Sequence, residues 1–282
     1  MNLFVNGCSF TGGTDITHDE ETGNILRRPP KYIWSNVIYN NLILPKYKDS
    51  SYTNLAIPGN SNDKIIRTTL EYFYKNDVPK NTIAIIQLSA IHRSEFFIES
   101  KNTYVNYCNT HNIHDKASYN LLDDSPMYRV LSNNILGYHF DHGDDVEWAL
   151  TSKEVQRHHD TAERSLKFLQ STTDLMNKFL QGVLLLQHFF DKREIPYVFT
   201  TMSNSNHLGT LKTAIERQLI PPPPLYTASM LDLIDTTKWD NTAMTILSGT
   251  NTISEDDAHP NEIGNRLIAA NIAKTLHRLN YI

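Results

Sequence analysis

A serine near the start of this sequence and a histidine near its end could together perform nucleophilic chemistry. Ser9 lies in the turn Gly-Cys-Ser-Phe-Thr at residues 7–11, and His259 lies in Asp-Asp-Ala-His-Pro-Asn at residues 256–261. A serine hydroxyl becomes a good nucleophile when a base takes its proton, and a histidine base needs a carboxylate to fix its tautomer. Asp256, three residues before His259, can fold back to supply that carboxylate. Taken singly, each segment is also compatible with an ordinary turn or an acidic helix start.

Alternating apolar strands and amphipathic helices predict the scaffold that must position these residues. Strands are expected at Leu3–Val5, Tyr52–Ile57, Thr82–Leu88, Tyr197–Thr201 and Met230–Ile234, and helices at 31–43, 62–75, 160–192 and from Pro260 to about Arg278, with Asn62 as the N-cap of the second helix. This order predicts an α/β fold of three αβα layers around a flavodoxin-like parallel sheet. Ligands of such sheets bind beyond the carboxyl ends of the strands, where the unusual segments fall.

Residues 94–159 interrupt this alternation. They are polar, rich in Asn, Asp, His and Tyr, and have no clean hydrophobic period. We therefore expect them to form an insertion that caps the sheet within a single domain of residues 1–282.

The composition narrows the classes of partner. The chain has 40% hydrophobic residues, 20% charged residues and a net charge of −5. This charge balance does not predict a basic surface that would bind nucleic acid or an anionic membrane. No apolar run is long enough to span a bilayer, and the N-terminal residues lack the pattern of a secretory signal. Two cysteines in 282 residues favour a reducing compartment. We expect a cytoplasmic or otherwise intracellular protein that acts on a small molecule or a carbohydrate, and the sequence leaves its oligomeric state open.

A third segment, residues 54–62, follows the second expected strand and contains Gly59, whose N–H could stabilise an oxyanion. A plain turn is the alternative. Together the three segments resemble the SGNH, or GDSL, hydrolase superfamily over residues 1–93 and 160–282, because serine, glycine and Asp-x-x-His-Pro follow in that order. The resemblance implies Ser9 as nucleophile, His259 as base and Asp256 as its orienter. It also implies that the backbone N–H groups of Ser9 and Gly59 form part of an oxyanion hole.

The sequence departs from the family pattern at two positions. Cys8 stands where the family usually has an aspartate, and a small buried thiol is the role we expect for it. The third strand ends without the asparagine that completes the family's oxyanion hole, and loss of one such donor typically costs about 10²–10³ in turnover. Candidate substitutes are Asn60, Asn62, Ser89, His92 and Arg93, of which Ser89 or Asn62 is preferred. Arg93 could instead bind an anionic group of the substrate or pair with Glu95 on the surface.

These residues favour an ester hydrolase that needs no cofactor and no metal. The resemblance implies a carboxylic ester as substrate, with an O-acetylated sugar or a small acyl ester as the best candidates. A non-catalytic binding or structural module on the same scaffold is the main alternative. The cluster of histidines and aspartates at residues 139–145 leaves a metal-dependent hydrolase as a third possibility, although its spacing matches no metal-site template.

Overall fold

Five parallel strands form the central sheet of the computed structural model. The structure describes residues 1–13, 17–18, 25–26, 32–57, 60–89, 93–98, 103–108, 138–139, 172–201, 230–240, 249–252 and 259–282. The strands are β1 (Asn2–Asn6), β4 (Tyr52–Asn54), β5 (Thr82–Leu88), β9 (Tyr197–Thr201) and β10 (Trp239–Asp240), in the spatial order β10-β9-β5-β1-β4. All four pairings are parallel. Counted along the chain, the order is 2-1-3-4-5, so the flavodoxin-like prediction is confirmed.

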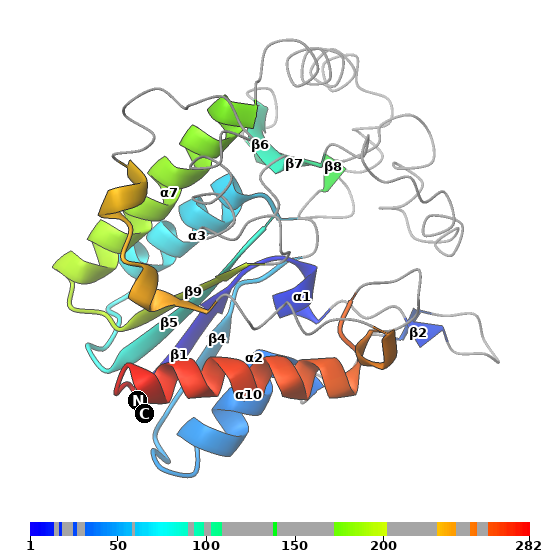
Figure 1. The fold of residues 1–282 in the computed structure, drawn as a ribbon, viewed down its shortest axis with the longest axis vertical. Helices are drawn as coiled ribbons and strands as arrows, with labels where there is room; N and C mark the ends of the chain where they lie inside the picture. The colour runs from blue at the N-terminus through cyan, green and yellow to red at the C-terminus, as the bar shows by residue number, and fades with distance from the viewer. Residues whose placement is uncertain are drawn as a thin grey trace.

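Helices cover both faces of this sheet (Figure 1). Helices α3 (Asn62–Lys75) and α7 (Thr172–Lys192) cover one face, and α2 (Trp34–Ile38), its π-helical continuation η2 (Tyr39–Ile43) and α10 (Glu262–Arg278) cover the other. Alternate strand residues supply the two cores: Phe4 and Ile86 pack on the α3 side, and Val5 and Ile85 on the α10 side. The three-layer αβα prediction is therefore confirmed.

The fifth strand is not where the sequence pattern placed it. Residues 230–233, predicted as a strand, are helical, and the fifth strand is β10, Trp239–Asp240. A short apolar run fits a buried strand and a buried helical turn equally well. Met230 and Leu231 pack against the core on the α3 side and Ile234 is buried within it. The predicted helix 160–192 is present from Thr172 onward, and residues 160–171 lie outside the described part.

Two helix starts also differ from prediction by one or two residues. The N-cap of α3 is Ser61, whose hydroxyl accepts the N–H of Lys64, and not Asn62. Helix α10 begins at Glu262 with Asn261 as its cap, two residues after Pro260. In both cases several residues near the start can cap a helix, and the tertiary partners of each side chain decide between them.

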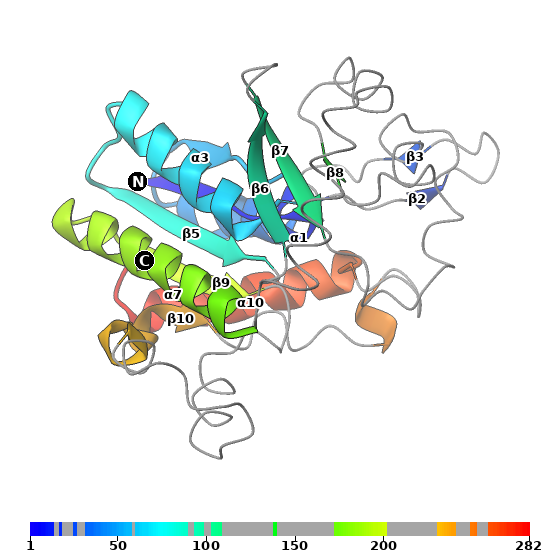
Figure 2. The same ribbon diagram turned by 90° about the horizontal axis from the view of Figure 1, so that it is seen from above.

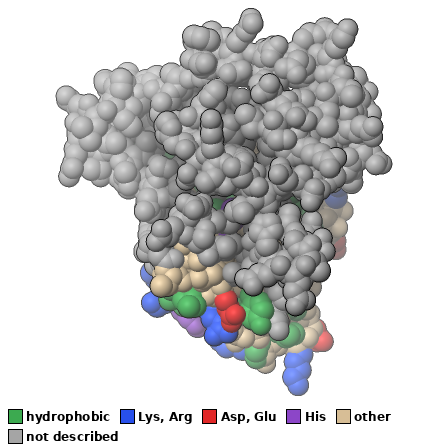
Figure 3. Space-filling model, turned by 90° about the vertical axis from the view of Figure 1, so that its right-hand side faces the viewer, with side chains coloured by type: hydrophobic (Ala, Val, Ile, Leu, Met, Phe, Trp, Pro, Cys, Tyr) green, Lys and Arg blue, Asp and Glu red, His purple; other side chains and the backbone are tan. Residues whose placement is uncertain are grey.

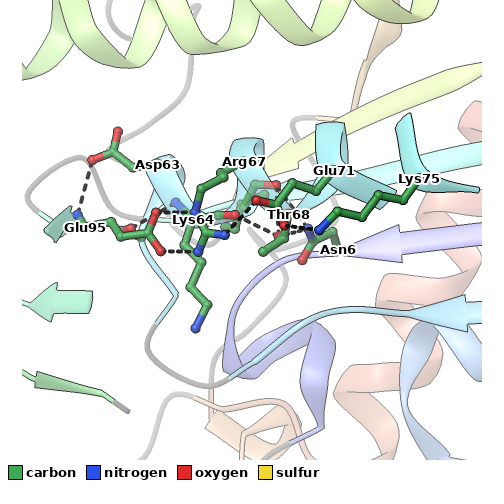
Figure 4. Close-up of polar contacts among 10 residues, drawn as sticks. Asn6, Asp63, Lys64, Arg67, Thr68, Glu71, Lys75 and Glu95 are labelled. Carbon is green, nitrogen blue, oxygen red and sulfur yellow. Dashed lines mark hydrogen bonds and ion pairs between the residues drawn. The ribbon is translucent and has the colours of Figure 1, made fainter. Parts of the chain in front are cut away.

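The first part of the predicted insertion is an antiparallel hairpin of β6 (Arg93–Ile98) and β7 (Thr103–Cys108), joined by the short β8 (Tyr138–His139). Figure 2 shows β6 and β7 rising beside α3, and a second small sheet pairs β2 (Thr17–His18) with β3 (Ile25–Leu26). Arg67 of α3 binds the buried Glu95 carboxylate of β6 through Nε at 2.9 Å and Nη2 at 2.6 Å, which raises the pKa of Arg67 (Figure 4). Most of residues 94–159 lie outside the described part, so their capping role stays a prediction.

Among the described residues, no helix is both long and apolar enough to cross a membrane. Within the described part of the face in Figure 3, basic, acidic and hydrophobic side chains lie next to one another.

We expect the packing of α10 on the sheet to contribute strongly to stability. Ile272 is fully buried there, whereas Ile263 on the same helix is 55% exposed. Replacement Ile272→Ala should lower the free energy of unfolding by about 2–5 kcal/mol because it leaves a cavity. Ile263→Ala, the matched control, should change it by less than about 0.5 kcal/mol. Urea unfolding followed by circular dichroism measures both, and equal losses would contradict this packing.

Candidate active site

The side chains of Ser9 and His259 meet at the carboxyl edge of the sheet. The Oγ of Ser9 lies 2.7 Å from Nε2 of His259, although 250 residues separate them in the chain. Ser9 is the first residue of the short helix α1 (Ser9–Gly12), which follows β1 directly, and both side chains are partly exposed. A hydroxyl at this distance can give its proton to the imidazole ring when that nitrogen carries none.

A chain of buried hydrogen bonds connects the segment of Ser9 with that of His259. The indole N–H of Trp34 donates to the carbonyl of Phe10 at 3.1 Å, and the backbone N–H of Trp34 donates to Oδ1 of Asn265 at 3.0 Å. The amide of Asn265 in turn donates to the carbonyl of Pro260 at 2.9 Å. The Phe10 ring also packs on the His259 ring, with centroids 4.8 Å apart. These contacts tie both reactive segments to α2 and α10.

The loop before α10 is held by the side chain of Asn261. Its Nδ2 donates to the carbonyls of Thr250 at 2.6 Å and Thr252 at 2.9 Å, while its Oδ1 caps α10 by accepting the N–H of Gly264 at 3.0 Å. A β-bridge joins Thr252 to Pro260. His259 therefore directly precedes a segment, Pro260 and Asn261, that these contacts hold in place.

The turn that carries Ser9 packs tightly against the middle strand. A Cβ placed on Gly7 would lie 2.7 Å from Oγ1 of Thr11 and 2.8 Å from Oε1 of Gln87, so only glycine fits there. Cys8 is fully buried with a reduced thiol, the role expected for it. Gln87 accepts hydrogen bonds from this turn, and the sequence analysis gave it no role. A polar residue within an otherwise apolar strand is the signal that could have identified it.

Asn6, the last residue of β1, was also missed by the sequence analysis. Its Nδ2 lies 2.9 Å from Oγ1 of Thr68, 2.9 Å from Oγ1 of Thr69 and 3.1 Å from the carbonyl of Ile65, all on α3. Its Oδ1 accepts the N–H of Gly7 at 2.8 Å. Figure 4 shows Asn6 beside Thr68, at the opposite end of the polar cluster from Glu95. One buried amide thus fixes the end of β1 to α3.

The predicted oxyanion and substrate residues that the structure describes form two groups. Asn60, fully buried, donates from Nδ2 to the carbonyl of Gly7 at 2.9 Å. Asn62 and Ser89 form a reciprocal pair: Nδ2 of Asn62 donates to the Ser89 carbonyl at 3.0 Å, and the Ser89 N–H donates to Oδ1 of Asn62 at 2.7 Å. Arg93 donates from Nη1 to the Ser89 hydroxyl at 3.0 Å, while Glu95 pairs with Arg67 instead of with Arg93.

Three further candidates, Asp256, Gly59 and His92, lie outside the described residues. So do Asp141, His142, Asp144 and Asp145 of the histidine and aspartate cluster. Within the described part of the chain, no group of three His, Cys, Asp or Glu side chains could hold a metal ion.

The neighbouring strand β4 supports α1 through Asn54. Its Nδ2 donates to the carbonyl of Thr11 at 3.0 Å and to the hydroxyl of Tyr52 at 3.1 Å. Burial raises the pKa of Tyr52, although its hydrogen bonds with Ser35 and Asn54 oppose this shift. The phenol therefore stays protonated at neutral pH and remains a neutral hydrogen-bonding partner in this contact.

We expect Asn261 to stabilise the loop of His259 through both ends of its amide. Asn261→Ala removes the cap and two donated bonds, and should lower the free energy of unfolding by about 2–4 kcal/mol. Asn261→Asp keeps a capping oxygen but loses both donors, so its loss should be smaller. Asn40→Ala, which removes one exposed bond to Asn36, is the control and should change stability by less than about 0.5 kcal/mol. Thermal unfolding ranks the three variants. An Asn261→Ala variant as stable as the wild type would contradict the proposed role of Asn261 in holding this loop.

No family model and no curated protein matches this sequence. Among solved structures, the chain is similar to the psychrotrophic esterase EstA from Pseudoalteromonas sp., inhibited by monoethylphosphonate, with 9% identity, a TM-score of 0.47, and coverage of 99% of this chain and 98% of that one. It is similar to a G-D-S-L family lipolytic protein from Desulfitobacterium hafniense with 10% identity, a TM-score of 0.42, and coverage of 98% and 99%. A member of the lipolytic protein G-D-S-L family from Veillonella parvula has 11% identity, a TM-score of 0.32, and coverage of 98% of both chains.

Proposed function

We propose that this chain is a serine hydrolase that cleaves a carboxylic ester. Ser9 is the nucleophile, His259 is the general base and Asp256 orients the imidazole. The single observation that carries the proposal is the 2.7 Å contact between Ser9 Oγ and His259 Nε2. Neither a metal nor a cofactor is needed, because the hydroxyl, the imidazole and backbone N–H groups can supply the nucleophile, the base and the oxyanion donors.

In the acylation step, Ser9 Oγ attacks the carbonyl carbon of the ester while His259 Nε2 takes the hydroxyl proton. The carbonyl oxygen becomes an oxyanion as the new carbon–oxygen bond forms. When this tetrahedral species collapses, the bond to the alcohol oxygen breaks and His259 returns the proton to that oxygen. The alcohol leaves, and Ser9 carries the acyl group.

In the deacylation step, water attacks the acyl carbon and gives one proton to His259. The bond between Ser9 Oγ and the acyl carbon then breaks, and His259 protonates Oγ. The carboxylic acid leaves and the enzyme returns to its starting state. The same imidazole thus serves as base and then acid in both halves of the reaction.

The oxyanion would be stabilised by the backbone N–H groups of Ser9 and Gly59 together with a third donor from the end of β5. Of the preferred substitutes, Asn62 has its amide engaged with the Ser89 backbone. Ser89 is the better choice, because Nη1 of Arg93 donates to its hydroxyl oxygen at 3.0 Å. A charge-assisted bond to the oxygen also polarises the hydroxyl as a donor. An O-acetylated sugar or a small acyl ester remains the substrate class that we propose.

Labelling by a fluorophosphonate probe tests this proposal directly. Attack by Ser9 Oγ forms an oxygen–phosphorus bond and expels fluoride, so the wild-type protein should be labelled and Ser9→Ala should not. His259→Asn should lower the labelling rate, and the hydrolysis of short-chain nitrophenyl esters, by about 10²–10⁴ because the base is lost. Ser50→Ala is the matched control, since Ser50 precedes β4 at the opposite edge of the sheet and should be labelled as the wild type is.

The outcomes separate the three function classes. A wild-type protein that is neither labelled nor active on nitrophenyl esters would exclude the hydrolase and favour a binding module. Activity that chelators abolish and that survives Ser9→Ala would instead favour the metal-dependent hydrolase.

A further inference from the structure

Gln87 places a buried amide near the carboxyl end of the otherwise apolar strand β5, against the turn that carries Ser9. It is fully buried on β5, and the strand contacts β1 on one side and β9 on the other. Its Oε1 accepts the hydroxyl of Thr11 at 2.7 Å and the backbone N–H of Cys8 at 3.3 Å, and the Cys8 thiol lies 3.4 Å from it. Its Nε2 lies 3.4 Å from the same sulfur.

These partners bracket the nucleophile in sequence. Cys8 precedes Ser9 directly, and Thr11 follows it by two residues on the same short helix, α1. Because one carbonyl oxygen binds both, it fixes the start of α1 relative to the middle strand. Gly7 allows this close approach, since a Cβ there would lie 2.8 Å from Oε1 and 2.9 Å from Cβ of Gln87.

The position of Cys8 and Thr11 matters because His259 is held by contacts of its own, which are joined to those of Ser9 through the hydrogen bond between Trp34 and Asn265. The histidine loop is fixed through Asn261 and Asn265, whereas Ser9 is fixed through β1, Trp34 and Gln87. The 2.7 Å contact between Ser9 and His259 forms only if the two sets agree in position. Misplacement of a reactive group by about 1 Å can cost about 10²-fold in rate.

We propose that Gln87 is a positioning residue that sets the reactivity of Ser9 by holding α1 against β5. This inference rests on the proposed function of Ser9 and His259. Gln87 has no contact with the reacting atoms, so its effect should appear in the rate of the chemical step and not in substrate affinity.

Gln187 offers a matched control for the loss of a buried amide. It is 6% exposed, its Nε2 donates to the carbonyl of Leu233 at 2.9 Å, and its Oε1 accepts the N–H of Asp235 at 2.9 Å. It lies near the end of α7 that leads into β9, at the opposite edge of the sheet from Ser9. Gln→Met at either position keeps the length of the side chain and removes its amide.

The experiment compares the rate constant of fluorophosphonate labelling in wild type, Gln87→Met and Gln187→Met, at a temperature where circular dichroism shows all three folded. We expect Gln87→Met to be labelled at least tenfold more slowly, with kcat for a nitrophenyl ester reduced by a similar factor and KM changed less than twofold. Gln187→Met should keep the wild-type labelling rate even if its melting temperature falls by as much as that of Gln87→Met. If Gln87→Met is labelled as fast as the wild type, or if both variants slow equally, the inference is wrong. A wild-type protein that is not labelled at all would instead refute the proposed function.

Two further variants, Gln87→Glu and Thr11→Val, test whether the Oε1 atom of Gln87 is what positions Ser9. Gln87→Glu keeps an acceptor for Thr11 and Cys8 and should recover part of the labelling rate lost in Gln87→Met. Thr11→Val removes the shortest of the bonds and should slow labelling in wild type but add little to Gln87→Met. Independent, multiplicative effects of Thr11→Val and Gln87→Met would show that the bond between them does not position Ser9.

Discussion

The hydrogen bond between Ser9 and His259 joins two segments from opposite ends of the chain, and the rest of the fold is arranged so that they coincide. The parallel sheet brings the carboxyl ends of its strands to one edge, which puts the end of β1 beside the loops that follow the other strands. Trp34 and Asn265 then connect the segment of Ser9 with the segment of His259 through buried hydrogen bonds. The strand order brings the two segments to the same edge of the sheet, and these side chains set the distance between Ser9 and His259.

Buried amides, more than charges, fix this edge of the sheet. Four buried amides lie here, and in each of them both the oxygen and the nitrogen have a hydrogen-bond partner: Asn6, Asn62, Gln87 and Asn265. An amide can donate and accept at once without the desolvation penalty of an ion. The charged pair Arg67 and Glu95 is used instead where the β6–β7 hairpin meets α3.

The sequence predicted those parts of the structure whose signal is local. Strands such as Thr82–Leu88 have the predicted bounds. The expectation that Ser9 and His259 act together came from the resemblance of short segments to a known family, and the structure places Oγ of Ser9 2.7 Å from Nε2 of His259. The fifth strand was misplaced because Met230–Ile234, a short segment of four apolar residues and Asp232, carries no period that separates strand from helix. A polar residue within an apolar strand marks Gln87 as unusual, but the bonding partners of Asn6, Gln87 and Trp34 could not be predicted. Each depends on residues far away in the chain, as Trp34 does on Asn265 231 residues later.

The position of α10 has a consequence for the order in which this fold is completed during synthesis. Residues 1–13, which include Ser9, are synthesised before His259 and α10, which follow some 250 residues later. Until α10 has emerged and packed over the sheet, the apolar residues on that face of β1 and β5 lack the part of their cover that α10 supplies beside α2 and η2. A nascent chain without α10 therefore exposes part of this apolar face, and packing of α10 both covers that part and brings His259 to Ser9.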